Sequence, residues 1–218
     1  MVRVRPYAHH VFPWLVDRIL ALPGFQEQRV PSLAVARGQV LEIGFGCGGS
    51  LAAYPSGGEV VSLVGLEPNP GMLRRAAQST ASAPFPVHLL RASAERIPVA
   101  DRSFDTVVSH WTVCSLSRPV VALREVRRVL RPTGRFLFLE HGRAADPRLA
   151  RWQRRWSPVQ KLVAGGCRLD APVDLLIREA GFEIEALARY DARPGPRILT
   201  QMYRGSARVE RKATAGAS

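Results

Sequence analysis

A run of alternate glycines and two carboxylates are the residues of this sequence best suited to chemistry. The apolar stretch that opens residues 40–50 ends in three alternate glycines, Gly44, Gly46 and Gly48. A strand that turns on glycines can bring bare backbone close to a ligand. Glu42 precedes the first glycine by two residues, and a second acid, Glu67, closes the apolar run 60–66. Because a carboxylate at that second position can accept hydrogen bonds from both ribose hydroxyls, the pattern predicts a site for an adenosine-containing cofactor.

The glycine pattern alone fits two classes of cofactor. Gly44-x-Gly46-x-x-Gly49 also satisfies the fingerprint of dinucleotide-binding enzymes. Glu42 would be poorly placed beside a pyrophosphate, but it could serve a cationic cofactor. Further along the chain, residues 103–109 have a strand pattern, and residues 130–140 form a turn that feeds a buried strand.

In this order and spacing, the segments resemble the class I S-adenosylmethionine-dependent methyltransferases with a methyltransferase type 11 domain. The match runs from about Val40 to Glu140 and continues more loosely to Tyr203. The resemblance implies S-adenosyl-L-methionine as the cofactor, with its methionine part at the alternate glycines and its ribose on Glu67. Glu42 would then act on the amino group of the cofactor or near its sulfonium, directly or through water.

The resemblance also implies which residues surround the adenine. Pro68 and Asn69, which follow the ribose-binding acid, should line the adenine pocket. Many of these enzymes carry an Asp-Ala-Glu run after the third strand, whereas this chain has Ser93, Ala94 and Glu95. The contact to the adenine amino group is therefore expected to be weaker or mediated by water, while the backbone of Ala94 can still donate to the ring.

The residues after the fourth predicted strand should face the junction of cofactor and acceptor. Ser109 is expected to contact the cofactor. His110 could orient the cofactor, act as a base near neutral pH, or serve only as a capping or packing residue. Trp111 and Cys114 are candidates to contact the acceptor, although Cys114 could equally be a buried, inert thiol.

A second group of candidate acceptor contacts lies outside these strands. Tyr7 belongs to an aromatic N-terminal segment, and His141 is followed by Trp152, Trp156 and a Gly-Cys-x-Leu run at 166–169. This second group resembles the thiol-methyltransferase branch of the methyltransferase-like proteins and, more distantly, the quinone-biosynthesis C-methyltransferases. Proteins of that branch carry an N-terminal membrane anchor, which we do not expect here. The tryptophans could equally be core residues, but an aromatic and apolar lining favours a small lipophilic acceptor.

Alternation of apolar strands and amphipathic helices predicts an α/β fold. We expect a Rossmann-like, doubly wound, mostly parallel seven-stranded sheet with a C-terminal antiparallel strand and helices on both faces. The predicted helices span 119–130, 146–163 and 172–180. The predicted strands span 39–43, 60–66, 86–91, 104–109, 135–140, 182–190 and 197–204.

The chain length of 218 residues predicts one domain. We expect a single domain over residues 1–208, with an N-terminal helical cap at 1–37, a substrate-side insertion at 141–170 and a disordered tail at 209–218. No apolar run approaches the length of a membrane span, and no signal peptide is apparent, so we predict a cytoplasmic protein. The odd number of cysteines, without metal-ligand spacing, predicts reduced thiols and no metal site.

The net charge of +13 does not by itself indicate a nucleic-acid partner. Lysine occurs only at Lys161 and Lys212, so nearly all basic residues are arginines, as a GC-rich coding sequence would produce. The arginines are also scattered along the chain. We therefore expect a small-molecule methyl acceptor and no nucleic acid, while peripheral contact with an anionic membrane stays open.

These observations predict an S-adenosylmethionine-dependent methyltransferase that acts on a small, lipophilic acceptor, with a thiol as one candidate. The absence of an obvious catalytic dyad does not count against an enzyme, because the cofactor already carries the activated methyl group. A dinucleotide-dependent oxidoreductase is an alternative, but it would need a second half-sheet. A nucleic-acid methyltransferase is another, but Ser109-His110-Trp111-Thr112 replaces the Asn/Asp-Pro-Pro-aromatic run that such enzymes often carry.

Overall fold

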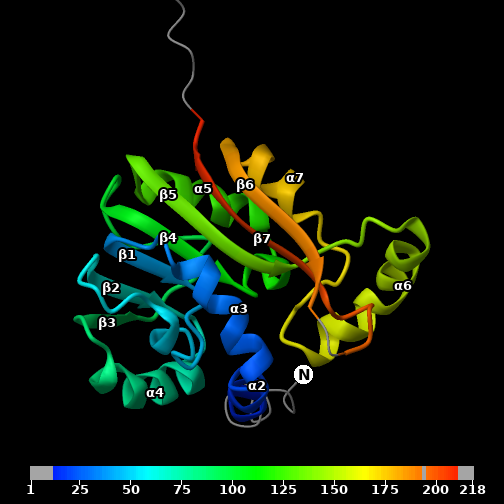
Figure 1. Ribbon diagram of the computed structural model, residues 1–218, viewed down its shortest axis with the longest axis horizontal. Helices are drawn as coiled ribbons and strands as arrows, with labels where there is room; N and C mark the ends of the chain where they lie inside the picture. Colours follow the sequence, from blue (N-terminus) through cyan, green and yellow to red (C-terminus); the bar gives the residue numbers. More distant parts are fainter. Residues whose placement is uncertain (1–11, 193–194, 211–218) are drawn as a thin grey trace, which may run out of the picture.

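A seven-stranded sheet forms the centre of the computed structural model, which describes residues 12–192 and 195–210 (Figure 1). Across the sheet the strands are β3 (Val87–Leu90), β2 (Val60–Leu66), β1 (Gly38–Ile43), β4 (Phe104–His110), β5 (Leu130–His141), β7 (Gln201–Val209) and β6 (Phe182–Asp191). The pairs from β3 to β5 are parallel, whereas β7 runs antiparallel to both β5 and β6. The predicted α/β class and the antiparallel C-terminal strand are confirmed.

The helices are α2 (Phe12–Leu20), α3 (Pro23–Leu33), α4 (Pro70–Ser79), α5 (Pro119–Val129), α6 (Pro147–Val163) and α7 (Val173–Glu179). Of these, α5 and α7 pack on one face of the sheet and α3 and α4 on the other, whereas α6 lies to one side (Figure 1). The three helices predicted by residue range, which correspond to α5, α6 and α7, agree with the structure to within one residue at each end. Within residues 12–192 and 195–210, no helix has the length and apolar character needed to cross a membrane.

Alternate residues of β1 enter two separate apolar cores. Leu41 belongs to the core that contains Leu123 of α5, on one face of the sheet. Val40 belongs to the core that contains Leu33 of α3 and Ala76 of α4, on the other face. A central parallel strand is buried on both faces, which explains why its sequence is a nearly continuous apolar run. The one charged residue in this strand, Glu42, is therefore placed in the interior.

Two strands depart from the predicted bounds. β5 begins at Leu130 because this residue pairs with Phe104 before the register between the two strands shifts. The last strand is predicted at 197–204, but residues 197–199 form a turn, and β7 follows it.

The C-terminal end of β7 also changes the predicted domain boundary. Val209 pairs with Phe182, so the boundary that we expected after residue 208 falls inside the strand. Residues 211–218, the remainder of the predicted tail, lie outside the described residues.

The N-terminal cap consists of two helices. α2 ends at Leu20, and Pro23 begins α3. Proline is favoured at the start of a helix because the N–H that it lacks would have no helical acceptor there. Residues 1–11, which include the candidate Tyr7, lie outside the described residues.

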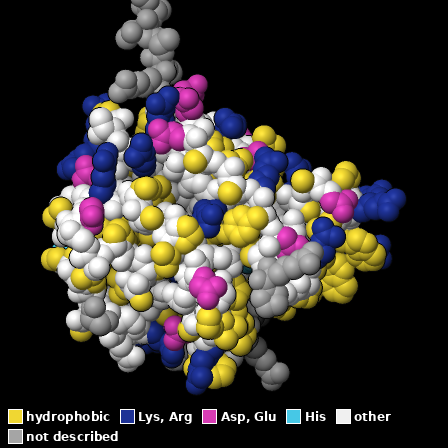
Figure 2. Space-filling view, in the orientation of Figure 1, with side chains coloured by type: hydrophobic (Ala, Val, Ile, Leu, Met, Phe, Trp, Pro, Cys, Tyr) yellow, Lys and Arg dark blue, Asp and Glu magenta, His cyan; other side chains and the backbone are white. Residues whose placement is uncertain are grey.

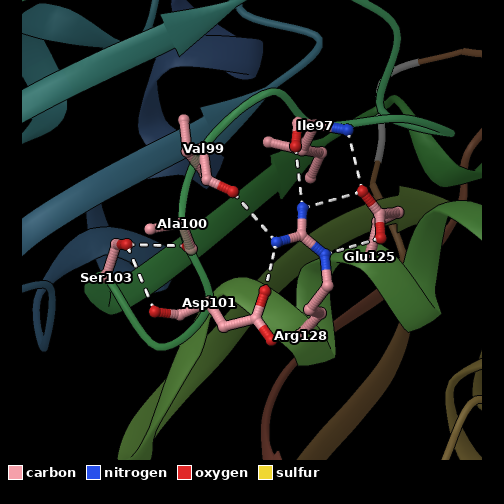
Figure 3. Close-up of polar contacts among 7 residues, drawn as sticks. All are labelled: Ile97, Val99, Ala100, Asp101, Ser103, Glu125 and Arg128. Atoms are coloured by element: carbon pink, nitrogen blue, oxygen red, sulfur yellow. Dashed lines mark hydrogen bonds and ion pairs between the residues drawn. The ribbon is translucent and has the colours of Figure 1, made fainter.

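Arg128 of α5 holds the loop that leads into β4 (Figure 3). Its guanidinium donates to the carbonyl oxygens of Ile97 at 2.7 Å and Val99 at 2.9 Å. It also pairs with the carboxylates of Asp101 at 2.6 Å and Glu125 at 2.8 Å. Glu125 in turn accepts a hydrogen bond from the backbone N–H of Ile97. The Arg128 side chain therefore fixes the loop to α5 at three residues, and Glu125 adds a second contact to Ile97.

We expect Arg128→Met to lower the free energy of unfolding by about 1–3 kcal/mol, because two part-buried carbonyl oxygens and a carboxylate lose their donor. Urea unfolding of the purified variant measures this change. Arg124→Met is the matched control, since Arg124 lies exposed on the same helix. Equal unfolding free energies for the two variants would show that the Arg128 contacts contribute nothing.

Candidate active site

The glycine loop, residues 44–49, leaves β1 with its three alternate glycines in left-handed backbone conformations. Their φ angles are +64° at Gly44, +61° at Gly46 and +80° at Gly48. A Cβ atom at Gly44 would collide with the side chain of Thr112, whereas one at Gly46 would meet no atom nearer than 3.9 Å. The loop is therefore packed tightly at its start and open at Gly46, where a ligand can approach the backbone.

Glu67 lies directly after β2 and contacts this loop. Its side chain is buried, and its two carboxylate oxygens accept hydrogen bonds from the backbone N–H of Gly46 at 3.1 Å and of Asn69 at 2.8 Å. Burial raises the pKa of Glu67, and these two donors oppose the shift. Each carboxylate oxygen accepts a hydrogen bond from only one of these backbone N–H groups and can accept at least one more. The carboxylate can therefore still accept hydrogen bonds from two neighbouring hydroxyls, as a ribose would require.

The two residues after Glu67 have different surroundings. Pro68 is exposed beside the carboxylate. The side chain of Asn69 caps α4 by accepting from the backbone N–H of Gly71 at 2.8 Å. Asn69 therefore fixes the start of α4 and, through its own N–H, the position of Glu67.

Glu42 is the buried charge at the end of β1. One of its oxygens accepts hydrogen bonds from the hydroxyls of Ser50 and Tyr54, each at 2.8 Å. Burial raises the pKa of Glu42 to about 7, and the two hydroxyls and the nearby charge of Arg29 oppose this shift. At neutral pH this carboxyl group is therefore poised between its protonated and ionised forms.

A narrow cavity of about 60 Å³ lies between the glycine loop and the N-terminal cap. Its walls include Glu42 and Gly46 from the sheet side and Asp17 and Gln26 from the cap. An ion pair of 2.5 Å between Asp17 and Arg75 joins α2 to α4. The bare backbone at Gly46, with the carboxyl groups of Glu42 and Glu67 nearby, fits the amino-acid and ribose parts of a nucleoside cofactor.

Arg29 of α3 is a residue of this site that sequence reasoning missed. It is buried, and its guanidinium donates to the carbonyl oxygen of Gly49 at 2.6 Å. The same guanidinium lies 5.1 Å from the ring centroid of Trp111. Arg29 therefore ties the cap both to the glycine loop and to the residues after β4, and no local pattern in the sequence signals these distant contacts.

His110, the last residue of β4, lines the same cavity. Its Nε2 lies 2.6 Å from the hydroxyl oxygen of Ser32, while Nδ1 is buried without a hydrogen-bond partner among the described residues. Burial lowers the pKa of His110 to about 3, with a further contribution from Arg29. Because the His110 ring binds a proton so weakly, it is a poor general base at neutral pH. The ring is better suited to orienting a ligand in the cavity.

The buried carboxylate of Glu140, near the end of β5, organises the loop after β4. It accepts hydrogen bonds from the hydroxyl of Ser109 at 2.5 Å and from the backbone N–H groups of Thr112, Val113 and Cys114 at 3.1, 3.1 and 3.2 Å. The Ser109 hydroxyl, which we expected to contact the cofactor, thus donates to Glu140. The sequence showed Glu140 as the end of a strand but contained no sign of these four donors.

Trp111 occupies a backbone conformation that a large side chain rarely adopts. Its φ is +50°, and its backbone N–H donates to the carbonyl oxygen of Leu139 at 2.7 Å. The indole packs edge-on against Phe25 of α3, with 5.4 Å between the ring centroids. This strained residue therefore aims its ring at the cap, where it helps to close the site.

The predicted adenine-side run forms a turn that is tied to α5. Ser93 is exposed and accepts a hydrogen bond from the backbone N–H of Glu95 at 3.2 Å. Ala94 is buried in the apolar core that contains Leu123. The carboxylate of Glu95 accepts from the backbone N–H of Arg118 at 2.8 Å and pairs with its guanidinium at 3.1 Å. The turn is thus anchored, and the Glu95 carboxylate already has a partner.

The candidate acceptor residues separate into two groups. Cys114 and His141 come together with Cys167 at the carboxyl ends of β4 and β5. Trp152 and Trp156, by contrast, lie on α6 with 56% and 50% of their surface exposed.

The tryptophans of α6 lie away from the cavity because they are on the outward face of this helix. The helix turns its polar residues Gln153 and Ser157 inward, where they bond to Gly142 and Asp170. Its apolar side chains gather beside arginines on the right of the molecule in Figure 2, over the region that α6 occupies in Figure 1. The tryptophans are therefore neither core residues nor walls of the cavity.

Glu42 should give the protein a measurable dependence of stability on pH. Its folded pKa of about 7 exceeds its ordinary value of 4.5, so between these values the native state holds a proton that the unfolded chain releases. Raising the pH through this window therefore lowers the free energy of unfolding, by up to about 3 kcal/mol at about 1.4 kcal/mol per unit.

Glu42→Gln removes this titration and leaves every other group in place. Urea unfolding of both proteins at about pH 5 and about pH 8 gives the comparison. We expect the variant to gain stability relative to the wild type as the pH rises. A difference between the two proteins that stays constant with pH would contradict the assigned pKa.

The chain is similar in sequence to known methyltransferases. A family described as a methyltransferase domain matches residues 41–138. The human thiol S-methyltransferase TMT1B is 34% identical over 149 residues, which are 65% of this chain and 59% of that protein. A C-methyltransferase of ubiquinone and menaquinone biosynthesis, UbiE of Syntrophotalea carbinolica, is 34% identical over 133 residues, 59% of this chain and 54% of its own. The chain thus spans less than two thirds of the length of these relatives.

Solved structures agree on the fold. A chain from the Haloferax volcanii complex of the Trm112 methyltransferase activator with a methyltransferase superposes with a TM-score of 0.71 and 17% identity, covering 91% of this chain and 95% of its own. The [4+2]-cyclase SpnF gives 0.66 and 18%, covering 89% and 80%. The family and the fold imply S-adenosylmethionine as the cofactor. Residues 41–138 of the chain thus match a methyltransferase domain, and they lie in a sheet of the Rossmann-like methyltransferase fold.

Proposed function

We propose that the chain binds S-adenosylmethionine at the glycine loop and transfers a methyl group to a small, lipophilic thiol. The observation that carries the proposal is the buried Glu67 carboxylate, bonded to Gly46 of the open glycine loop and to Asn69. When bound, the cofactor supplies a methyl group that is already activated on a sulfonium. The protein then has to bind, align and exclude water.

Each of these tasks has a residue suited to it. Glu67 accepts the ribose hydroxyls, and Glu42 faces the cavity side of the glycine loop, where it can attract a cationic group when ionised. His110 presents a neutral ring to the same cavity. Arg29 and Trp111 hold the cap against the loop, which limits the entry of water.

The low pKa of His110 favours a thiol among the acceptors. His110 has a pKa of about 3, so it is poorly suited to take a proton from an alcohol or a phenol near neutral pH. A thiol ionises near pH 8.5 without help and is a strong nucleophile once ionised. The curated relatives that are named thiol S-methyltransferases support the same choice.

Glu67→Ala should weaken the binding of S-adenosylhomocysteine. The ribose hydroxyls would lose an acceptor that is charged and buried, at about 1–3 kcal/mol for each lost partner, which corresponds to at least a tenfold loss of affinity. Titration calorimetry measures this loss. Glu59→Ala is the matched control, because Glu59 is an exposed acid at the opposite end of β2. An unchanged dissociation constant in a folded Glu67→Ala protein would remove Glu67 from the cofactor site.

Release of S-adenosylhomocysteine from S-adenosylmethionine, measured across a panel of small thiols, phenols and quinols, tests the acceptor. The Glu67→Ala protein serves as the blank. We expect turnover with lipophilic thiols, at rates that rise with pH as more thiolate forms. Turnover with quinols or phenols and none with thiols would replace the proposed acceptor, even though the cofactor assignment would survive.

A further inference from the structure

Three side chains that commonly bind transition metals converge behind the loop that follows β4. Cys114 belongs to that loop, His141 ends β5, and Cys167 lies in the turn after α6. The two sulfurs are 3.6 Å apart, and the sulfur of Cys167 is also 3.6 Å from Nδ1 of His141. All three potential ligand atoms lie within 4.8 Å of one another.

We propose that Cys114, His141 and Cys167 bind a zinc ion. Zinc binds sulfur at about 2.3 Å and imidazole nitrogen at about 2.0–2.1 Å, with tetrahedral angles. These lengths place two sulfur ligands about 3.8 Å apart, and a sulfur and a nitrogen about 3.6 Å apart. The two separations that involve Cys167, 3.6 Å each, already match this spacing, and Cys114 and His141 lie within 4.8 Å of each other. An ion could therefore enter with small side-chain shifts.

The backbone around the cluster holds its ligands in place. The N–H of Cys114 donates to Glu140 at 3.2 Å, and its carbonyl oxygen accepts from the N–H of Arg168 at 2.9 Å. Gly166, with a φ of +98°, lets the turn after α6 approach the carbonyl of Ser115 so closely that a Cβ would lie 2.7 Å away. Ligands that are fixed before binding lose little entropy when they receive an ion.

The chemistry of the donors favours zinc over the other arrangements open to them. A disulfide needs its sulfurs at about 2.05 Å, much closer than the 3.6 Å observed between Cys114 and Cys167. Thiols are weak hydrogen-bond donors, so hydrogen bonding alone gives little reason to gather two of them with an imidazole. Two thiolates and a divalent ion have no net charge, which lowers the cost of burial.

Three protein ligands leave one tetrahedral position of the ion open, as in catalytic zinc sites. Binding of the ion does not rest on the proposed function.

Elemental analysis of the purified protein by mass spectrometry tests the site. We expect about one zinc ion per wild-type chain and less than about a tenth of that in His141→Ala and Cys167→Ser. Cys47→Ser is the matched control, because Cys47 is also a buried cysteine but lies outside the cluster, and it should keep its zinc. His141→Cys replaces one ligand by another and should also keep the ion.

Cobalt substitution of the wild-type protein gives a second readout that does not depend on the folding of any variant. We expect the intense visible bands of tetrahedral cobalt together with a thiolate-to-cobalt charge-transfer band. A wild-type protein without metal, or with its thiols found as a disulfide, would overturn the proposal. Equal zinc content in all of the variants would overturn it as well, because the ion would then have other ligands.

The outcomes also separate this inference from the proposed function. Zinc that depends on His141 and Cys167, in a protein that methylates no thiol, would leave the metal site standing and remove the thiol acceptor. Methylation of thiols by a protein that holds no metal would do the reverse.

Discussion

The burial of three carboxylates at the carboxyl ends of β1, β2 and β5 is the constraint on which the rest of the site depends. A carboxylate removed from water destabilises the fold unless donors replace its hydration. Glu42 recruits two hydroxyls, Glu67 two backbone N–H groups, and Glu140 one hydroxyl and three backbone N–H groups. Apart from Ser109, which lies in β4, these donors belong to the loops that follow the strands, where an open α/β sheet binds its ligands. The same interactions that make burial tolerable therefore shape the site.

One consequence is that the loops have a defined shape without a ligand. Glu140 fixes the loop that carries Trp111 and Cys114, and Arg29 links that loop to the cap and to the glycine loop. A site that is already ordered loses less conformational entropy when it binds. The fold alone does not determine the reaction, since a [4+2]-cyclase shares it. The chemistry must therefore be argued from the side chains that these loops present.

The sequence predicted what is encoded locally and missed what depends on distant contacts. Strands, helices and the glycine loop could be recognised because their signals lie within a few neighbouring residues, and most strand bounds agree to within one residue. The positions of Arg29, Glu140 and the cysteine–histidine cluster could not, because Cys114 and Cys167 are separated by 53 positions in the chain. Because these cysteines are so far apart in the chain, their spacing did not resemble that of metal ligands, and we predicted no metal site. The tryptophans of α6 misled because an aromatic pattern does not reveal which face of a helix is exposed.

A crystal structure of the protein with S-adenosylhomocysteine would show directly whether the buried Glu67 carboxylate and the open backbone at Gly46 form the cofactor site. We expect both ribose hydroxyls on the oxygens of Glu67, with the amino-acid end of the ligand along the glycine loop toward Glu42. A ligand bound elsewhere, with Glu67 still bonded only to Gly46 and Asn69, would show that the cofactor site lies in another part of the molecule.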